Sequence, residues 1–210
     1  MNAPDDANPR TIDHFIGQPG VIRQVRVALE ASWHTGAALP HMLLCGPPGL
    51  GKTELARIVA AEVGVALKES LGQTLNERGH LAGFLMSARE KDVLFIDEAH
   101  ELRPSSQTLL YRAMAERKLL LSGKSFGPAP TTINLPPFTL LAATTDEFRL
   151  AKPLRERFAM PLRFDFYHGD ELDRVLRQRV RALGLDVEEG VAASIAARAK
   201  GTPRLALRLL

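Results

Sequence analysis

The sequence has little of what builds disulfide-stapled, fibrous or membrane proteins. It contains one cysteine, Cys45, so no disulfide can form within the chain, and a reducing, cytoplasmic location is expected. Its 16 glycines show no triplet period, which excludes a collagen-like helix. No apolar run approaches the roughly 20 residues that a membrane-spanning helix needs, so no membrane partner is expected.

An excess of charge of one sign is also missing. The 27 lysines and arginines against 24 aspartates and glutamates give a net charge of +3, too small to argue for or against a nucleic-acid partner. Hydrophobic residues make up 45% of the chain, enough for a core that offsets the conformational entropy lost on folding. A length of 210 residues fits one domain with a small satellite.

Short apolar runs alternate with helical patterns over most of the chain. The predicted strands are residues 41–45, 93–96, 138–144 and 162–166. The predicted helices are residues 20–33, 53–63 and 104–116. Residues 118–121 and 131–135 flank a turn that contains Gly and Pro, which is typical of a projecting hairpin. This alternation predicts an α/β fold with a parallel sheet flanked by helices.

After Tyr167 the pattern becomes purely helical. The predicted helices are residues 170–183, 187–199 and 202 onward. We therefore expect two parts: an α/β nucleotide-binding domain over residues 1–167 and a small all-α lid domain over residues 168–210.

One motif fits the phosphate-loop pattern GxxxxGK(S/T) in full. It consists of Gly46, Pro47, Pro48, Gly49, Leu50, Gly51, Lys52 and Thr53. Glycines let backbone N–H groups surround a polyanion, and the following helix presents its positive N-terminus. We expect Lys52 to reach the β- and γ-phosphates of ATP and Thr53 to hold Mg²⁺. A chance Gly-Pro turn is the weaker interpretation, because the loop lies between a predicted strand and a predicted helix.

An acidic pair follows the second predicted strand. Asp97 is expected to bind Mg²⁺, mostly through water, and Glu98 to orient or deprotonate the attacking water. Residues 97–100 also spell the DEAH box of a helicase superfamily. Those helicases use two RecA-like domains and the chain has length for one, so we interpret the match as coincidence. His100 is interpreted as an exposed residue at a helix start, at least as readily as a catalytic group.

Three further residues indicate which class of phosphate-loop ATPase the chain belongs to. Thr145 follows the strand at 138–144 and would place a hydroxyl beside the γ-phosphate. Arg157 would suit the γ-phosphate of a neighbouring subunit, as an arginine finger supplied in trans. Arg204 lies at the start of a late helix, where the helical domain could fold back over the nucleotide.

In this order the motifs resemble those of the AAA+ ATPases and, within them, the RuvB family of Holliday-junction branch-migration motors. The resemblance runs from about residue 8 to residue 210. Its most specific pieces are residues 15–18, 44–53, 93–98, 135–140, 153–158, 166–167 and 201–204. The chain departs from the family pattern at Glu54, at residues 146–148 and around the hairpin tip at 125–130.

The resemblance implies roles for particular residues. Asp97 and Glu98 would be the Walker B pair, Thr145 the sensor 1 residue and Arg157 the arginine finger. Around the nucleotide, the implied ligands of the adenine and of the sensor 2 region are Phe15, Ile16, Tyr167, Pro203 and Arg204.

The resemblance also implies partners. The motor would be a homo-oligomeric ring, a hexamer, around duplex or four-way-junction DNA. A RuvA-like partner would engage the hairpin at residues 118–135. The family continues into a winged-helix domain that contacts DNA, so DNA contacts are expected from parts not in this chain.

Two other functions stay open. The chain could be a AAA+ switch or remodeller that acts on a protein partner, such as a clamp-loader-like or mobile-element ATPase, which the altered hairpin slightly favours. It could also be a nucleotide-binding module without turnover, which the presence of Glu98 disfavours.

Overall fold

The computed structural model of the chain describes residues 9–77, 79–123 and 127–210. Within them, five parallel strands form the central sheet in the order β2-β3-β6-β1-β7. The strands are β1 (Met42–Cys45), β2 (Lys68–Leu71), β3 (Val93–Asp97), β6 (Thr139–Thr144) and β7 (Met160–Arg163). Every residue of β1 and β6 is buried, as expected of strands that are covered on both faces.

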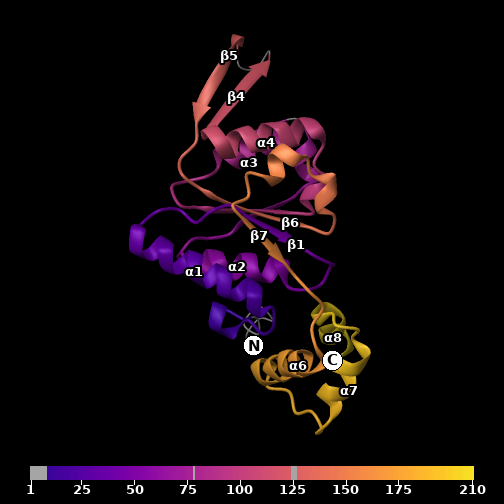
Figure 1. The fold of residues 1–210 in the computed structure, drawn as a ribbon. Coiled ribbons are helices and arrows are strands. Elements are labelled where there is room, and N and C mark those ends of the chain that lie inside the picture. The colour runs from indigo at the N-terminus through magenta and orange to yellow at the C-terminus, as the bar shows by residue number, and fades with distance from the viewer. Residues whose placement is uncertain (1–8, 78, 124–126) are drawn as a thin grey trace.

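Helices cover both faces of this sheet (Figure 1). One face carries α1 (Pro19–Thr35) and α2 (Lys52–Glu62), and the other carries α3 (His80–Met86) and α4 (Pro104–Glu116). Because side chains alternate along a strand, β3 contributes to two cores. Phe95 packs with the cluster under α1 and α2, whereas Leu94 and Ile96 pack with the cluster under α3 and α4.

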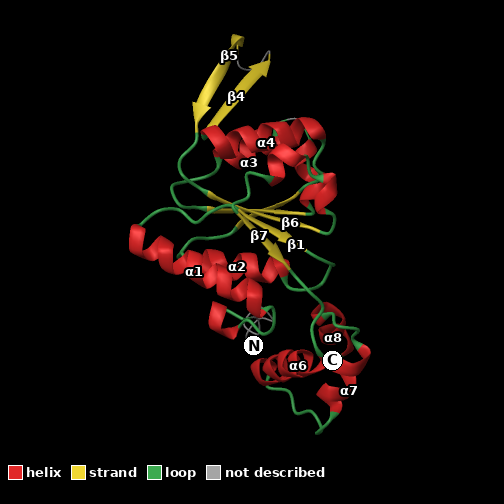
Figure 2. Cartoon of the chain, viewed as in Figure 1, coloured by secondary structure: helices red, strands yellow, loops and turns green. Residues whose placement is uncertain are grey.

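An antiparallel hairpin projects beyond α4, at the end of the molecule opposite the C-terminal helices (Figure 2). Its strands are β4 (Lys118–Gly123) and β5 (Gly127–Asn134), paired from Lys118 with Asn134. Residues 124–126 of the expected hairpin tip lie outside the described residues. Since β4 follows α4 after a single residue, this helix joins the hairpin directly to the sheet domain.

The C-terminal helices pack on one another beside the sheet domain (Figure 1). They are α6 (Gly169–Leu183), α7 (Val191–Arg198) and α8 (Pro203–Leu209), and the short α5 (Lys152–Arg155) precedes β7. Among the described residues, two backbone hydrogen bonds join this lid to the rest: Arg204 N–H donates to Gly49 O at 3.2 Å, and Tyr167 N–H to Gly201 O at 2.9 Å. None of the described helices is long and apolar enough to cross a bilayer.

The predicted fold class is confirmed, with differences in detail. Sequence reasoning did not find β2 or α3. In β2 exposed and half-buried residues alternate, and the strand lies at the sheet edge, where a buried apolar run is not needed. Helix α7 begins at Val191 and not at residue 187, because Gly190 before it has φ 88°. The division between residues 167 and 168 stays a prediction.

Gln18 joins the start of the chain to the segment that enters the lid. It is buried, and its side chain bonds the backbone of Asp165 twice. Nε2 donates to Asp165 O at 2.6 Å, and Asp165 N–H donates to Oε1 at 3.0 Å. The adjacent Gly17 lies against the Tyr167 ring, where a Cβ would approach ring atom Cε1 to 2.5 Å. The Gln18 hydrogen bonds and the packing of Gly17 together form a clamp that holds the N-terminal segment against Tyr167.

We expect Gln18→Leu to lower the free energy of unfolding by about 2 kcal/mol, because the N–H and C=O groups of Asp165 lose part-buried hydrogen bonds. Urea denaturation measures the change. Gln73→Leu, at an exposed position, is the matched control and should change stability by less than about 0.5 kcal/mol. Equal stability of the two variants would contradict the proposed clamp.

Candidate nucleotide site

A pocket of about 540 Å³ opens between the lid and the carboxyl edge of the sheet. After β1 the chain builds β2, β3 and β6 on one side of that strand and β7 on the other. Ligands of open α/β sheets bind at such a switch in strand order. The pocket wall brings together most of the predicted residues: Phe15, Ile16, Pro48, Gly49, Gly51, Lys52, Thr53, Asp97, Glu98, Tyr167, Pro203 and Arg204.

The phosphate loop makes unusually close contacts with the lid and with the N-terminal segment. Gly49 has φ 79°, and a Cβ there would lie 2.9 Å from Cβ of Arg204. Gly51 has φ 95°, and a Cβ there would lie 3.1 Å from Cζ of Phe15. Side chains at these positions would fill the space where three segments converge. The cradle therefore depends on glycine and suits a phosphate chain.

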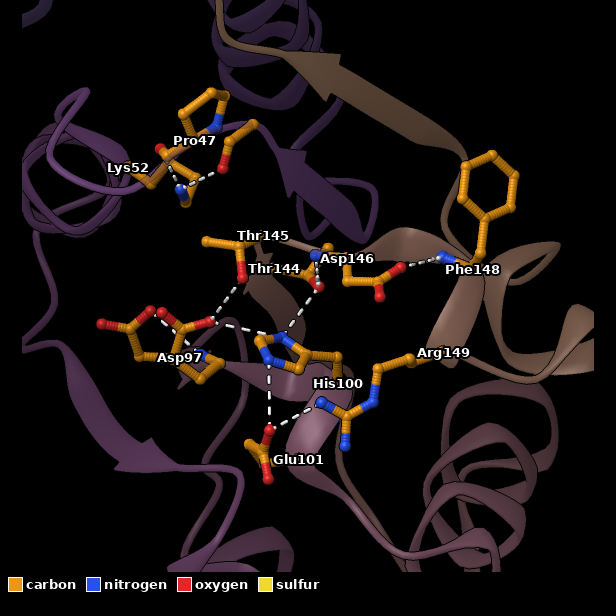
Figure 3. A network of polar contacts seen from close by, with 12 residues as sticks. Pro47, Lys52, Asp97, His100, Glu101, Thr144, Thr145, Asp146, Phe148 and Arg149 are labelled. Atoms are coloured by element: carbon orange, nitrogen blue, oxygen red, sulfur yellow. Dashed lines mark hydrogen bonds and ion pairs between the residues drawn. The ribbon is translucent and has the colours of Figure 1, made fainter. Parts of the chain in front are cut away.

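Lys52 lies at the end of this loop and is 7% exposed. Its Nζ donates to Gly46 O at 2.6 Å and to Pro47 O at 2.8 Å (Figure 3). Burial lowers the pKa of Lys52, and the nearby Glu98 and Asp97 carboxylates oppose part of this effect. Lys52 is also the first residue of α2, so the positive helix terminus faces the same space. The loop thus offers an ammonium group and a helix N-terminus to an anion.

Two oxygen-bearing side chains meet beside the loop. Thr53 Oγ1 donates to Asp97 Oδ2 at 3.3 Å. A hydroxyl and a carboxylate are donors that suit Mg²⁺, which keeps several waters and commonly adds phosphate oxygens. Among the described residues no group of three or more His, Cys, Asp or Glu side chains could hold a metal ion. The pair therefore fits a magnesium ion that is bound together with a nucleotide.

Glu98 follows Asp97 and has a left-handed backbone with φ 48°. Its Oε2 accepts from Thr145 Oγ1 at 3.4 Å and lies 3.2 Å from His100 Nδ1 (Figure 3). Thr145 lies just beyond β6, the strand between β1 and β3. Thr145 is not among the described residues that line the pocket, but it contacts Glu98, which is one of them. The predicted sensor residue and the predicted base are therefore neighbours.

His100 is not the exposed residue that the sequence suggested. Its side chain is 10% exposed, and the ring lies between Glu98 and Glu101. Nε2 lies 3.2 Å from Glu101 Oε1, and Nδ1 lies 3.1 Å from Thr144 Oγ1. The correction has a physical reason: β6 runs beside β3, so the end of β6 covers the turn on which His100 lies. Spacing along the chain carries no signal of that cover.

Arg157 lies just after α5 and is exposed. It is not among the described residues that line the pocket, so it does not contribute to the pocket wall of its own chain. By contrast, Arg155 lies over the Phe148 ring, 5.5 Å from the ring centroid. The two side chains thus differ in their surroundings, because Arg155 packs on an aromatic ring whereas Arg157 is exposed to solvent.

A buried glutamine that sequence reasoning missed supports the start of α5. Gln107 of α4 is 4% exposed. Its Nε2 donates to Leu102 O at 2.9 Å and to Arg149 O at 3.3 Å, and Ala151 N–H donates to its Oε1 at 2.7 Å. The helix that carries the hairpin is thereby bonded to the segment that leads to Arg157.

The departures from the family pattern have partners within the chain. Asp146 accepts the N–H of Phe148 at 3.1 Å. Glu147 pairs with Arg163 at 3.0 Å and accepts from Cys45 Sγ at 3.3 Å. Arg163 lowers the pKa of Glu147, whereas burial, followed by this hydrogen bond, raises the pKa of Cys45 to about 12.

Glu54 is the acidic departure nearest the phosphate loop. Its carboxylate lies 3.7 Å from Arg57 Nη1, so a cation accompanies the added negative charge. Both residues line the pocket.

The remaining pocket wall has an apolar end. Phe15 and Ile16 from the N-terminal segment line the pocket together with Val175 of α6 and Leu207 of α8. Gln178 Nε2 donates to His14 O at 2.9 Å and so ties α6 to the N-terminal segment. No sequence signal marks the lid residues here, because their helices show ordinary amphipathic spacing and no motif.

Two family models match almost the whole chain. The model described as the Holliday junction DNA helicase RuvB P-loop domain matches residues 7–164. The model described as the RuvB AAA lid domain matches residues 167–210. The chain belongs to the RuvB family.

Relatives of the RuvB family show how far this likeness extends. The branch migration complex subunit RuvB of Koribacter versatilis is 45% identical over 96% of this chain and 56% of that protein. The same subunit from Wolbachia sp. is 46% identical over 96% of this chain and 63% of that protein. The solved Thermotoga maritima RuvB branch migration motor has a TM-score of 0.84 and 40% identity, over 96% of this chain and 63% of that one. The chain thus spans less than two thirds of these relatives.

Proposed function

We propose that this chain is the ATPase motor of a cytoplasmic RuvB-like protein that couples ATP hydrolysis to DNA translocation in branch migration. The observation that carries the proposal is the convergence of Lys52, Thr53, Asp97, Glu98 and Arg204 on one pocket. Membership of the RuvB family supports the same function. We also propose the ring homo-oligomer, the hexamer, as its working form.

Each residue has a proposed task in this pocket. Lys52 and the loop N–H groups bind the phosphates of ATP, while Thr53 and Asp97 hold Mg²⁺. Bound there, the ion would neutralise charge that develops on the phosphates. Glu98 orients the attacking water and accepts its proton, and Thr145 beside it senses the γ-phosphate.

The apolar end of the pocket is the proposed adenine site. Phe15, Ile16 and Tyr167 would contact the base, and Pro203 precedes Arg204 at the start of α8. Because Arg204 belongs to the lid, losing its contact with the γ-phosphate would change how the lid sits on the sheet domain. That movement is the proposed source of mechanical work.

Arg157 is the proposed finger in trans. Its exposure and its absence from the set of described residues that line the pocket support a role at a neighbour's γ-phosphate. Each active site then needs two subunits. DNA contacts and a RuvA-like partner at hairpin 118–135 are further proposals, supported by relatives that are named branch migration complex subunits.

We predict that Lys52→Ala abolishes nucleotide binding, whereas Arg157→Ala binds ATP with the wild-type Kd and loses turnover by about 10³-fold. The two variants mixed in equal amounts should regain part of the lost activity, because each supplies the half that the other lacks. ATP binding and steady-state hydrolysis by the assembled protein measure these effects. Lys152→Ala, at an exposed residue of α5, is the matched control. Failure of the mixture to gain activity, with rings formed, would contradict a finger in trans.

A AAA+ remodeller that acts on a protein partner is the second candidate. The observation that favours it is the exposed Phe148, which is 79% exposed where the family pattern has a glycine. Exposed aromatic residues commonly anchor protein contacts.

The substrate class is testable with the complete gene product. We predict that four-way-junction DNA raises its ATPase rate severalfold and that the stimulation weakens steeply with salt, because phosphate contacts release counterions. A single-stranded oligonucleotide of equal nucleotide content is the control. No response to either DNA, together with stimulation by a protein partner, would favour the remodeller.

A further inference from the structure

We propose that His100 is a positioning residue that holds the Glu98 carboxylate for catalysis. This inference rests on the proposed ATPase function and assigns a task to a side chain that the motifs left unexplained. It is carried by the geometry around the imidazole, where each ring nitrogen faces a different carboxylate (Figure 3).

The contact with Glu98 is direct. Nδ1 of His100 lies 3.2 Å from Oε2 of Glu98, and Thr145 Oγ1 donates to the same oxygen at 3.4 Å. The Glu98 side chain is 42% exposed, so packing alone leaves its rotamers open. Its direction therefore depends on these two polar contacts.

The far side of the ring is held as well. Nε2 lies 3.2 Å from Oε1 of Glu101, and this oxygen also accepts from Arg149 Nη1 at 2.8 Å. The backbone oxygen of Glu101 accepts from Asn76 Nδ2 at 2.7 Å. Glu101 is held at two points and the His100 side chain is 10% exposed, so the imidazole is held in one orientation beside Glu98.

The ring also keeps two negative groups apart. Glu98 and Glu101 lie on opposite edges of the same imidazole, and its removal would leave them facing one another across a cavity. Glu98, left with Thr145 as its polar contact, would then turn toward solvent. A misplaced base lowers the rate of the chemical step while leaving the phosphate-binding groups untouched.

Three substitutions separate the two edges of the ring. Asparagine places its amide nitrogen near the Nδ1 position, from which it can donate to Glu98. Glutamine reaches the Nε2 position and can donate to Glu101 but not to Glu98. Alanine removes both ring nitrogens.

The test measures kcat, KM and nucleotide Kd of the assembled protein for His100→Ala, His100→Gln and His100→Asn. We expect kcat to fall at least about tenfold in the alanine and glutamine variants, with Kd within about twofold of wild type. Asparagine should restore kcat to within about threefold. His80→Ala, at an exposed histidine that lies 3.4 Å from Glu77, is the matched control and should match wild type.

Crystal structures of the alanine and asparagine variants give a readout that is independent of turnover. We expect the Glu98 carboxylate to leave its place in the alanine variant and to keep it in the asparagine variant. Wild-type kcat in His100→Ala, equal rescue by Gln and Asn, or an unmoved Glu98 would each overturn the proposal. A wild-type protein that hydrolyses no ATP would instead refute the proposed function, and the position of Glu98 would still decide the role of His100.

Discussion

The parallel direction of five strands is the constraint on which the rest of the structure depends. Parallel strands end at one edge, so residues far apart in the sequence arrive there together. The phosphate loop follows β1, Asp97 ends β3, and Thr145 comes just after β6. With β6 between the other two strands, Thr145 is placed to contact Glu98. The strand order therefore brings the polar residues of the candidate site together.

The rest of the pocket comes from the ends of the chain. The lid and the N-terminal segment close over the phosphate loop, and they can approach because Gly49 and Gly51 have no side chains. Gln178 bonds the lid to the backbone of His14 in the N-terminal segment, and Gln18 bonds that segment to the backbone of Asp165, just before the lid. A nucleotide in this pocket would touch the sheet domain and the lid at once. This is the physical basis for proposing that its hydrolysis moves the lid.

Local motifs could be predicted from the sequence, whereas contacts across the fold could not. Lys52, Thr53, Asp97 and Glu98 stand in short patterns next to strands, so their convergence follows once the sheet is parallel. The burial of His100 and the role of Gln107 were not predicted, because their partners, Thr144 at the end of β6 and Ala151 before α5, are distant in the sequence and nothing in their spacing indicates burial. The apolar wall from α6 and α8 depends on how the lid docks, which amphipathic spacing does not encode.

Local sequence patterns also could not predict the edge strand β2 or the partners of residues that depart from the family pattern. Strand β2 has too few apolar residues to be recognised, since one side of it has no neighbouring strand. Glu147 breaks the family pattern but gains Arg163 and Cys45 as partners, a compensation that appears only when β7 lies beside β1.

A crystal structure with Mg²⁺ and a non-hydrolysable ATP analogue tests the central claim most directly. The account predicts phosphates on Lys52 and the loop N–H groups, the ion beside Thr53 and Asp97, and the adenine against Phe15 and Tyr167. It also predicts that Arg204 of the same chain and Arg157 of a neighbouring chain approach the γ-phosphate. A nucleotide bound elsewhere, or one whose γ-phosphate is met by Arg157 of its own chain, would contradict it.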